Sequence, residues 1–453
     1  MTTPKASVYF RSLGCPKNQL DTEVMLGSLA LEGFAIAERL EDADVAVVNT
    51  CSFIESAREE SIQAILEVAD LREAGRLRAL VVAGCLPQRY GAELAKELPE
   101  VDAFVGTAAF RDIAPILEDA LAGRSRGIYV EAGRTHLYDD TTPRLLVGPG
   151  HSAYVKIAEG CDRICAFCAI PGIRGRFQSR TLDSLVRELR QLAEAGVREV
   201  NLVAQDSTSW GKDLPGRPRL AELVRALDDV PGIDWVRLLY LYPSAVDDAL
   251  IEAIAGAKRV LPYVDVPLQH ASDGMLRAMR RGTTAARQRS LVARLRSGIP
   301  GLTLRTTFIV GFPGESEADF EALCDFVRET RFDRVGVFRY SDEAGTAGAE
   351  LGDKVPRGVA RARYRRLAGI QSEIMAEALR AKLGLEGDLL VDSVLGRGRA
   401  LGRFASQAPE IDGITYLTAK GQLSPGELLR ARVSGVRGGV DLEAEAVRGG
   451  GRA

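Results

Sequence analysis

Three closely spaced cysteines constrain this chain more than any other feature. Cys161, Cys165 and Cys168 follow a C-x₃-C-x₂-C spacing within the segment EGCDRICAFCAIPGIRGR. A free cysteine often packs as a small hydrophobic side chain, but the glycine, proline and charged residues around these three predict a loop and not a core strand. Thiols gathered in a loop are typical of a metal site.

Zinc and an iron–sulfur cluster are the two kinds of metal site that this loop could form. Zinc needs a fourth Cys or His at short spacing, and the nearest one, His151, lies upstream of the preceding strand. Iron–sulfur clusters take soft thiolates, and ferredoxin-type sites use four cysteines for four irons. Three cysteines would leave one iron open to a substrate or cofactor. The spacing therefore favours the cluster, with zinc as the alternative.

Three further cysteines each end a short apolar run. The runs SVYFRSLGC, DVAVVNTC and LRALVVAGC end at Cys15, Cys51 and Cys85. Short runs rich in Val and Leu predict buried parallel strands, and the helical stretches between them complete an α/β pattern with right-handed crossovers. The carboxyl ends of parallel strands meet at one edge of a sheet, where ligands bind. We expect these thiols to converge as a second three-thiolate site; three unrelated core cysteines are the alternative.

Strand and helix patterns continue to alternate after the cysteine loop. Strand candidates are SAYVKIAEG, REVNLVAQD, WVRLLYLYP, YVDVPLQH, LTLRTTFIVGF and RVGVFRYS. Six such units predict a partial (β/α)₆ barrel, in which the chemistry sits at the carboxyl ends of the strands. The polar residues at these ends are Gln205, Asp206, Tyr242, Gln269, His270 and Tyr340. For His270, a structural hydrogen bond is as good an interpretation as a substrate contact.

The segment TTFIVGFPGESEADF predicts a strand, a glycine-containing turn and a helix. Glycine after a strand, here Gly311, lets backbone approach a ligand closely; a simple turn is the alternative. Ser316 with Asp319 three residues later has the pattern of a capping box. Cys324 falls on the apolar stripe of the following helix, so we interpret it as structural.

The character of the chain changes after an arginine-rich helical stretch at 355–383. Short β-like runs separated by Gly and Pro predict a small all-β barrel, and GRGRALG near Gly396 is interpreted as a basic hairpin turn. The expected organisation is an N-terminal α/β domain at 1–140, the partial barrel at 141–375, the β-barrel at 376–446 and a disordered tail at 447–453.

Composition narrows the class of protein. The 453 residues give room for several cores, and a net charge of −3 argues against a constitutive, non-specific nucleic-acid binder. The sequence starts without a signal-peptide pattern and contains no apolar run long enough to span a membrane. We therefore expect a cytoplasmic protein without a membrane partner. In that compartment we expect the seven cysteines to be reduced, and we interpret the clustered ones as metal ligands and not as disulfides.

These motifs together resemble one enzyme family. C-x₃-C-x₂-C with Phe167 before the last cysteine resembles radical S-adenosylmethionine (SAM) enzymes, and nearly the whole chain resembles the methylthiotransferases among them. That family has an N-terminal three-cysteine domain, a radical-SAM partial barrel and a C-terminal TRAM β-barrel. SLGCPKNQLDTE, PLQHAS and APEIDG resemble the branch that methylthiolates the β-carbon of an aspartate in small-subunit ribosomal protein twelve.

The resemblance implies two [4Fe-4S] clusters and SAM as cofactors. It assigns Cys15, Cys51 and Cys85 to the cluster that carries the inserted sulfur, and Cys161, Cys165 and Cys168 to the cluster that binds and cleaves SAM. The hard chemistry then belongs to the cofactors, and no catalytic side chain is assigned. Expected SAM contacts are Phe167, Gln205, Ile309 and Gly311.

The partners implied are the ribosomal protein, free or in the ribosome, an electron donor such as flavodoxin or ferredoxin, and a sulfur donor. Glu410 and Asp412 lie in a turn-like PEIDG of a domain without cysteine, so we expect them to bind a basic protein substrate; acids that only face solvent are the alternative. Two other functions compete: a tRNA adenosine methylthiotransferase, against which the near-neutral tail argues, and a non-catalytic iron–sulfur RNA-binding or sensing protein.

Overall fold

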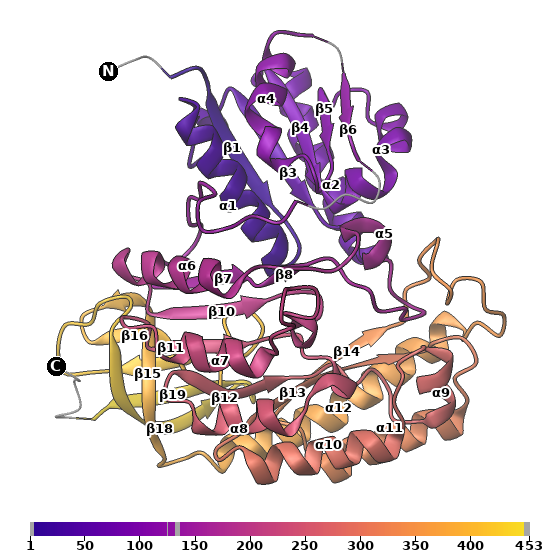
Figure 1. Ribbon diagram of the computed structural model, residues 1–453, viewed down its shortest axis with the longest axis vertical. Helices are drawn as coiled ribbons and strands as arrows, with labels where there is room; N and C mark the ends of the chain where they lie inside the picture. Colours follow the sequence, from indigo (N-terminus) through magenta and orange to yellow (C-terminus); the bar gives the residue numbers. More distant parts are fainter. Residues whose placement is uncertain (1–3, 125, 132–135, 448–453) are drawn as a thin grey trace.

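The computed structural model describes residues 4–124, 126–131 and 136–447. Its backbone forms two six-stranded parallel sheets followed by a closed five-stranded barrel. Figure 1 shows the N-terminal sheet with its helices lying over the central sheet, and the barrel beside one end of that central sheet. The expected fold class, an α/β multidomain chain with a small all-β barrel at its end, is confirmed.

The N-terminal sheet has the strand order β2-β1-β3-β4-β5-β6, and every pair is parallel. Every residue of β3 and β4 is buried, as expected for central strands covered by helices on both faces. The strands are β1 (Ser7–Ser12), β2 (Ala35–Ile36), β3 (Val45–Thr50), β4 (Ala79–Gly84), β5 (Ala103–Val105) and β6 (Gly127–Tyr129). The helices are α1 (Pro16–Leu31), α2 (Glu55–Glu73), α3 (Cys85–Glu97) and α4 (Ile113–Leu121).

The central sheet has the order β14-β13-β12-β11-β10-β7 and is also parallel. Its two outer strands do not pair with each other within the described residues, so it is a partial barrel, as predicted. The strands are β7 (Ser152–Lys156), β10 (Glu199–Val203), β11 (Trp235–Leu238), β12 (Val260–Asp265), β13 (Thr303–Val310) and β14 (Arg334–Arg339). A short antiparallel ribbon, β8 (Ala158–Glu159) with β9 (Gln178–Ser179), brackets the cysteine loop.

Helices cover the outer face of the central sheet (Figure 1). Ser316 and Asp319 form the predicted capping box at the start of α11, and Cys324 is fully buried in that helix. The arginine-rich stretch is α12, which packs on β14 and α11. The helices are α5 (Ile170–Arg174), α6 (Leu182–Glu194), α7 (Leu220–Asp228), α8 (Asp248–Gly256), α9 (Asp273–Ala278), α10 (Ala285–Gly298), α11 (Glu317–Thr330) and α12 (Arg357–Arg380).

The C-terminal barrel closes in the order β15-β16-β17-β19-β18. Gly396 and Gly398 form the turn between β15 and β16, so the glycine-rich segment is a hairpin as predicted. The strands are β15 (Glu386–Gly396), β16 (Arg399–Phe404), β17 (Thr415–Thr418), β18 (Leu428–Arg437) and β19 (Asp441–Ala446). The expected tail at 447–453 lies, except for Val447, outside the described residues.

A buried carboxylate fastens this barrel to the central sheet. Glu199, at the start of β10, pairs with Arg237 at 3.1 Å and with Arg403 of β16 at 2.7 Å. Burial opposes ionisation of Glu199, but Arg403 and Arg237 outweigh it and lower its pKa to about 2. Arg403 also pairs with Asp392, which accepts a hydrogen bond from His151 at the start of β7. The C-terminal unit is therefore bound to the sheet through charges that water does not reach.

The N-terminal domain is fastened in a similar way. Glu343, in the loop after β14, is buried and pairs with Arg58 and Arg89 of α2 and α3. Arg144, on the connecting segment, donates to Glu23 of α1 and to Glu188 of α6.

No helix within the described ranges is long and apolar enough to cross a membrane.

Candidate active site

The three N-terminal cysteines converge at the carboxyl edge of their sheet. Cys15, Cys51 and Cys85 follow the neighbouring strands β1, β3 and β4. Gly14 lies so close to Cys51 that a Cβ on it would sit 3.2 Å from the Cys51 sulfur. The Cys85 thiol donates to the side-chain oxygen of Asn18 at 3.6 Å, and the side-chain nitrogen of Asn18 donates to Thr50 O at 2.8 Å. These three cysteines therefore lie at one edge of the sheet, at the ends of neighbouring strands; that they form one site stays a prediction.

The second cysteine set lies on the loop between β8 and α5. The amide of Arg163 donates to the Cys161 sulfur at 3.4 Å, and the amide of Cys168 donates to Cys165 O at 3.1 Å. Arg281 donates to the Cys165 sulfur at 3.2 Å. The three cysteines thus lie on one short turn, and a cation from another part of the barrel contacts Cys165.

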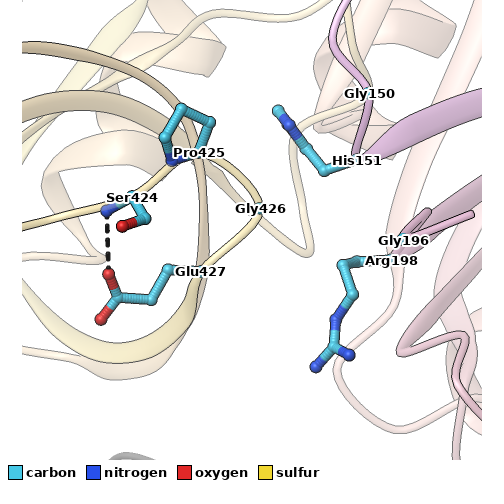
Figure 2. A pocket seen from close by; sticks show the side chains of 8 residues that line it. All are labelled: Gly150, His151, Gly196, Arg198, Ser424, Pro425, Gly426 and Glu427. Atoms are coloured by element: carbon cyan, nitrogen blue, oxygen red, sulfur yellow. Dashed lines mark hydrogen bonds between the residues drawn. The ribbon is translucent and has the colours of Figure 1, made fainter.

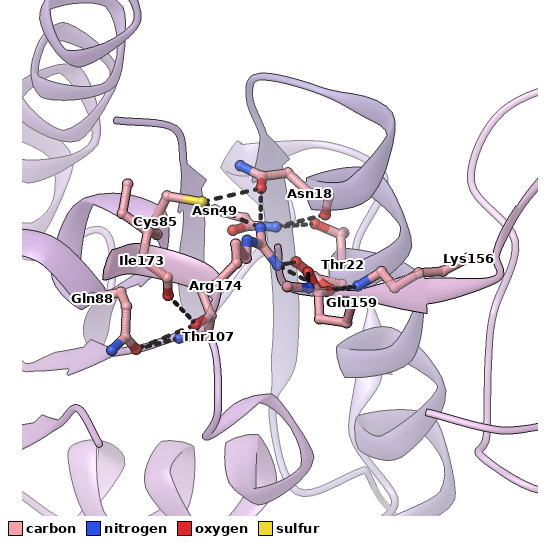
Figure 3. A network of polar contacts seen from close by, with 12 residues as sticks. Asn18, Thr22, Asn49, Cys85, Gln88, Thr107, Lys156, Glu159, Ile173 and Arg174 are labelled. Carbon is pink, nitrogen blue, oxygen red and sulfur yellow. Dashed lines mark hydrogen bonds and ion pairs between the residues drawn. The ribbon is translucent and has the colours of Figure 1, made fainter. Parts of the chain in front are cut away.

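Arg174 joins the two cysteine sets. It ends α5, shortly after Cys168, and it donates to the Cys85 sulfur at 3.2 Å. The same guanidinium donates to Asn18 and pairs with Asp21 at 2.6 Å. Figure 3 shows this network passing from Cys85 through Arg174 to Glu159, where the N-terminal domain and the central domain meet. A residue of the helix that follows the second cysteine set thereby contacts the first set directly.

The acids and bases of this network compensate one another. Burial opposes the charge of Glu159, but Lys156 and Arg174 dominate and lower its pKa to about 2. Burial also opposes the charge of Lys156, but Asp21 and Glu159 raise its pKa above the usual value. The group is therefore an ionised cluster in a region from which water is excluded, and each member depends on the others.

The thiols themselves sit in a low-dielectric setting. Burial raises the pKa of Cys85 to about 12 although Arg174 opposes this, and burial raises the pKa of Cys168 to about 12. Burial is also the main reason that the pKa values of Cys51 and Cys161 are raised. Metal binding at such thiols displaces protons, so their affinity for metal depends on pH.

The donor atoms fit a cluster of several irons better than a single ion. In the part of the chain that the structure describes, no three His, Cys, Asp or Glu side chains are gathered closely enough to hold one metal ion. A four-iron cluster takes its thiolates on separate irons, so its ligands are spread more widely. Each cysteine set offers three soft sulfur donors with an arginine beside it, and soft donors favour iron–sulfur clusters.

His151 does not serve as a fourth ligand of the cysteine loop. It precedes β7, at the opposite end of that strand from the loop, and its ring nitrogen bonds to Asp392 at 3.1 Å. It also lines a cavity of about 560 Å³ at the seam between the central sheet and the C-terminal barrel. Figure 2 shows this cavity between Arg198 and the Ser424–Glu427 segment, and none of its lining residues is a cysteine. A zinc site at the cysteine loop therefore lacks His151, the nearest candidate for a fourth ligand.

Two of the expected SAM contacts share one apolar cluster. Phe167 and Ile309 pack with Met279 and Phe312 beside the cysteine loop. Gly311 has a different role: a Cβ there would lie 2.6 Å from the Cβ of Ala360, and its amide donates to Glu315. Its lack of a side chain is therefore explained by the approach of α12.

Gln205 lies where a ligand could complete its hydrogen bonds. Its amide nitrogen donates to Glu159, while its side-chain oxygen is buried and has no partner in the structure. An unpaired buried oxygen is costly, and a donor from a bound molecule would satisfy it. The same holds for the side-chain oxygen of Gln269, which follows β12 and forms an isolated bridge with Phe308 of β13. Both residues were expected at the mouth of the barrel.

The other polar residues at the strand ends are held by the protein itself. Asp206 pairs with Arg163 at 2.7 Å, and the Tyr242 ring stacks against Arg163 and Arg281. His270 is fully buried and bonds to Glu315 at 3.1 Å, which supports the structural interpretation of this histidine. Tyr340 packs edge-on against Phe312, in the apolar cluster of Phe167.

Glu410 and Asp412 have different surroundings although they are two residues apart. Glu410 is exposed and has a left-handed φ of 66°. The carboxylate of Asp412 is buried; it accepts from the Tyr263 hydroxyl at 2.8 Å and from the Ala408 amide at 2.9 Å. Both acids were expected to bind a basic partner, but only Glu410 has an exposed carboxylate that could do so.

Several residues of the site had no assigned role in the sequence interpretation. Arg174, Asp21 and Lys17 all lie inside quoted motifs, but nothing local distinguishes them from surface charges. The sequence feature that could have revealed them is the presence of several charged residues beside the cysteines and glycines of these motifs. Only the tertiary structure shows that they are buried together.

Comparisons with known proteins agree with this architecture. Three family models match the chain: Uncharacterized protein family UPF0004 at residues 7–106, the Radical SAM superfamily at 155–327 and the TRAM domain at 383–447. Among solved structures, the radical SAM methyltransferase TsrM from Kitasatospora setae matches with a TM-score of 0.54 and 17% identity, over 86% of this chain and 79% of that one. At that identity the likeness concerns the fold.

Curated relatives are much more similar. The chain is 51% identical to the ribosomal protein uS12 methylthiotransferase RimO of Anaeromyxobacter sp. (strain K), over 94% of this chain and 90% of the relative. It is 50% identical to the protein of the same name from Sorangium cellulosum, over 94% and 88%. The RimO of Geobacter sulfurreducens is 46% identical over 96% and 97%.

Proposed function

The chain belongs to the ribosomal protein uS12 methylthiotransferase family, and on that premise we propose that it inserts a methylthio group at the β-carbon of an aspartate in uS12. It is a radical SAM enzyme whose cofactors are SAM and [4Fe-4S] clusters, and its C-terminal unit is a TRAM domain. The observation that supports the proposal most directly is the hydrogen bond from Arg174 to Cys85, because it brings the helix that follows the second cysteine set against the first set, across the domain junction.

We propose that each cysteine set holds one cluster. Cys15, Cys51 and Cys85 would hold the cluster that provides sulfur. Cys161, Cys165 and Cys168 would hold the cluster whose open iron binds SAM. Together with SAM, the clusters supply the one-electron chemistry that takes hydrogen from an unactivated carbon and the sulfur that replaces it.

The protein's own residues orient and shield this chemistry. Arg174 and Arg281 each donate to one cysteine sulfur, so each fixes a ligand from outside its own loop. Asp21, Lys156 and Glu159 hold Arg174 in place through buried ion pairs. The compensated charges keep bulk water from the junction without leaving a net charge there, which protects reactive species from side reactions.

We propose that SAM lies between the cysteine loop and the ends of β10 and β13. Phe167 and Ile309 offer apolar surface for the adenine, and Gln205 offers a buried oxygen that needs a donor. Gly311 would contribute through its backbone carbonyl only, since its amide is taken by Glu315. These four contacts stay predictions until SAM is bound.

The remaining partners are proposed from the chemistry. A low-potential electron donor such as flavodoxin or ferredoxin must reduce the cluster at Cys161–Cys168, and a sulfur donor must restore the other cluster. The exposed carboxylate of Glu410 suits a basic ribosomal protein, met either free or in the assembled subunit, and this substrate implies work in the cytoplasm. We propose domain boundaries at 140, in the segment that connects the two sheets, and at 375, within the last turns of α12 (Arg357–Arg380) before the barrel.

Mass spectrometry of ribosomal proteins tests the function. A strain that lacks this gene should lose a methylthio mass increment on uS12, and the fragment spectrum of the restored strain should place it on an aspartate. Transfer RNA from the same strains should keep its modified adenosines. Loss of a tRNA methylthio group with uS12 unchanged would show the function to be wrong.

A further inference from the structure

One side of α12 carries exposed arginines. From Arg357 to Arg366 the helix has five arginines and no acid. Arg363 and Arg366 pair with acids of α11 and of the turn before it. The other three are exposed and follow one another at intervals of four residues, so they share one side of the helix. These three, which we call the basic face of α12, are Arg357, Arg361 and Arg365.

The protein supplies almost no counter-ion to this basic face. Within the described residues, no carboxylate lies at ion-pair distance from Arg361 or Arg365. Arg357 reaches Glu55 of α2 only at 3.6 Å, and its side chain is 89% exposed. An exposed and distant pair of this kind contributes little to stability. The arginines of the basic face therefore do not hold the fold together.

A further cation and an aromatic ring lie at the same end of the helix. Tyr364, between Arg361 and Arg365 in the sequence, is 38% exposed. Arg339, the last residue of β14, is exposed and has no ion pair within the described residues. Val335 and Val337 of that strand pack into the core that the helices cover, so Arg339, two residues further on, leaves the sheet on the helix side.

The basic face begins beside the mouth of the partial barrel. Ala360 packs against Gly311, at the carboxyl end of β13. Lys354, just before the helix, donates to the carbonyl of Gly348, whose amide donates to Ala166 of the cysteine loop at 2.6 Å. From there α12 packs along β14, the edge strand of the central sheet (Figure 1). A partner on the basic face would thus lie next to the opening that admits substrate.

The chemistry of the basic face fits a polyanion. Its arginines are spaced by about one helical turn over a length of about 12 Å. Each guanidinium can form two parallel hydrogen bonds to a phosphate group, and an exposed tyrosine ring offers a surface on which a base can stack. The whole chain has a net charge of −3, so this surface is a local exception. A basic ribosomal protein would be repelled by it, so uS12 itself is not the expected occupant.

We propose that the basic face of α12 binds the phosphate backbone of ribosomal RNA, and that the enzyme therefore meets uS12 in the assembled small subunit. This inference rests on the proposed function and decides between the free and the assembled substrate, which that function leaves open. In the subunit a ribosomal protein is surrounded by RNA. Contacts to RNA beside the mouth add affinity that free uS12 cannot offer, because both contacts are then made by one particle.

The test measures the affinity of the cluster-loaded, full-length enzyme for free uS12 and for small ribosomal subunits from a strain that lacks this gene. The wild-type enzyme should bind subunits about tenfold more tightly than free uS12 at physiological salt. Arg361→Gln combined with Arg365→Gln should remove most of that difference and leave the binding of free uS12 unchanged. The slope of log affinity for subunits against log salt should become shallower by about 1.5, since each phosphate contact contributes about 0.7–0.9.

Arg190→Gln combined with Arg225→Gln is the matched control. It removes the same charge from α6 and α7 of the same domain, at two exposed arginines that have no ion pair within the described residues. The affinity for subunits and its salt dependence should stay as in wild type. Arg361→Lys combined with Arg365→Lys should keep most of the wild-type affinity for subunits, because the positive charges remain.

The other outcomes would overturn the proposal. An equal loss of affinity for subunits and for free uS12 would show that the basic face binds protein. An unchanged affinity for subunits would show that it is only solvated, and an equal loss in the control variant would show a general effect of charge. Loss of binding to vesicles of phosphatidylglycerol, with subunit binding unchanged, would assign the face to a lipid surface.

Failure of this inference can be distinguished from failure of the proposed function. If the wild-type enzyme modifies uS12 in neither form, the proposed function fails. If it modifies free uS12 and binds subunits no more tightly than the free protein, the function stands and the assignment of the basic face of α12 fails.

Discussion

Arg174 donates a hydrogen bond to the sulfur of Cys85, 89 residues earlier in the chain, over a distance of 3.2 Å. The two residues belong to different domains, and each lies next to a different cysteine set. The bond therefore makes the geometry of one proposed cluster dependent on the loop of the other. Its consequences can be tested.

Replacing Arg174 by Gln should lower the iron content of the first cluster and the thermal midpoint of the enzyme. Asp21 and Glu159 would lose a buried cation, and breaking a buried pair costs roughly 3–5 kcal/mol. Iron analysis and calorimetry on the anaerobic protein measure both effects. Arg176→Gln is the control, because Arg176 is 87% exposed and its pair with Asp162 should contribute about 1 kcal/mol or less. Equal effects in the two variants would contradict the role given to Arg174.

Iron content should divide between the two cysteine sets. The anaerobically prepared protein should hold about eight irons, four for each cluster. Replacing Cys161, Cys165 and Cys168 by Ala should leave roughly half of that iron and abolish SAM cleavage. Iron analysis and detection of 5′-deoxyadenosine measure the result. Continued production of 5′-deoxyadenosine by the triple variant would show that the SAM-cleaving cluster is elsewhere.

Glu343 should hold the N-terminal domain on the central domain. Its buried carboxylate pairs with Arg58 and Arg89, so Glu343→Gln leaves two arginines without their counter-ion. We expect faster hydrogen exchange in α2 and α3, measured by mass spectrometry. Asp342→Asn, which changes an exposed neighbour, should leave that exchange unaltered. Unchanged hydrogen exchange in Glu343→Gln would mean that contacts other than those of Glu343 hold the N-terminal domain on the central domain.

Acid should loosen the C-terminal barrel through Glu199. Its folded-state pKa of about 2 lies below the ordinary value of 4.5, so the stabilisation is complete above about pH 4.5 and is lost as pH falls toward 2. In thermal unfolding of the cluster-free protein, Glu199→Gln should be less stable than wild type at pH 6. The difference should shrink as the pH falls below 4.5. A difference that stays constant with pH would exclude Glu199 as the titrating group.

Substitutions of Glu410 and Asp412 should have different effects: the first should change the binding of uS12, and the second should change the stability of the enzyme. Glu410→Gln should weaken the binding of uS12 and reduce its salt dependence, because it removes an exposed charge. Asp412→Asn should lower the thermal midpoint, since the carboxylate accepts from Tyr263 and Ala408 and faces Arg334. Titration of uS12 at two salt concentrations, together with thermal unfolding, distinguishes the two. A loss of stability in Glu410→Gln would contradict this division.

Much of the fold follows from patterns that act locally. Buried parallel strands such as Val45–Thr50 are recognisable because they begin with a run of apolar residues, Val45–Val48, and the cysteines that follow such strands must share one sheet edge. The last strand, Asp441–Ala446, has no comparable pattern, because its alternating acids, Glu443 and Glu445, have low β-propensity. Only Leu442 and Ala444 turn inward, and the pairing with β17 and β18 supplies the rest.

The charged part of the site could not be predicted in this way. Asp412 sits in a turn-like motif, which indicates a solvent-facing acid, but Tyr263 reaches it across 149 residues of chain. Lys156, in the middle of an apolar run, gives no sign that its partners are Asp21 and Glu159. Pairing of buried charges depends on how domains dock, and a pattern of neighbours along the chain does not contain that information.

The buried ion pairs of Glu199 with Arg237 and Arg403 have a consequence for the order of events during protein synthesis. The ribosome adds Arg403 204 residues after Glu199, so the central sheet emerges with this carboxylate balanced by Arg237 alone. The start of β10 acquires its final charge balance only when the last domain has been made and has docked. A chain that ends before Arg403 therefore contains every strand of the central sheet but leaves the buried Glu199 with one arginine in place of two.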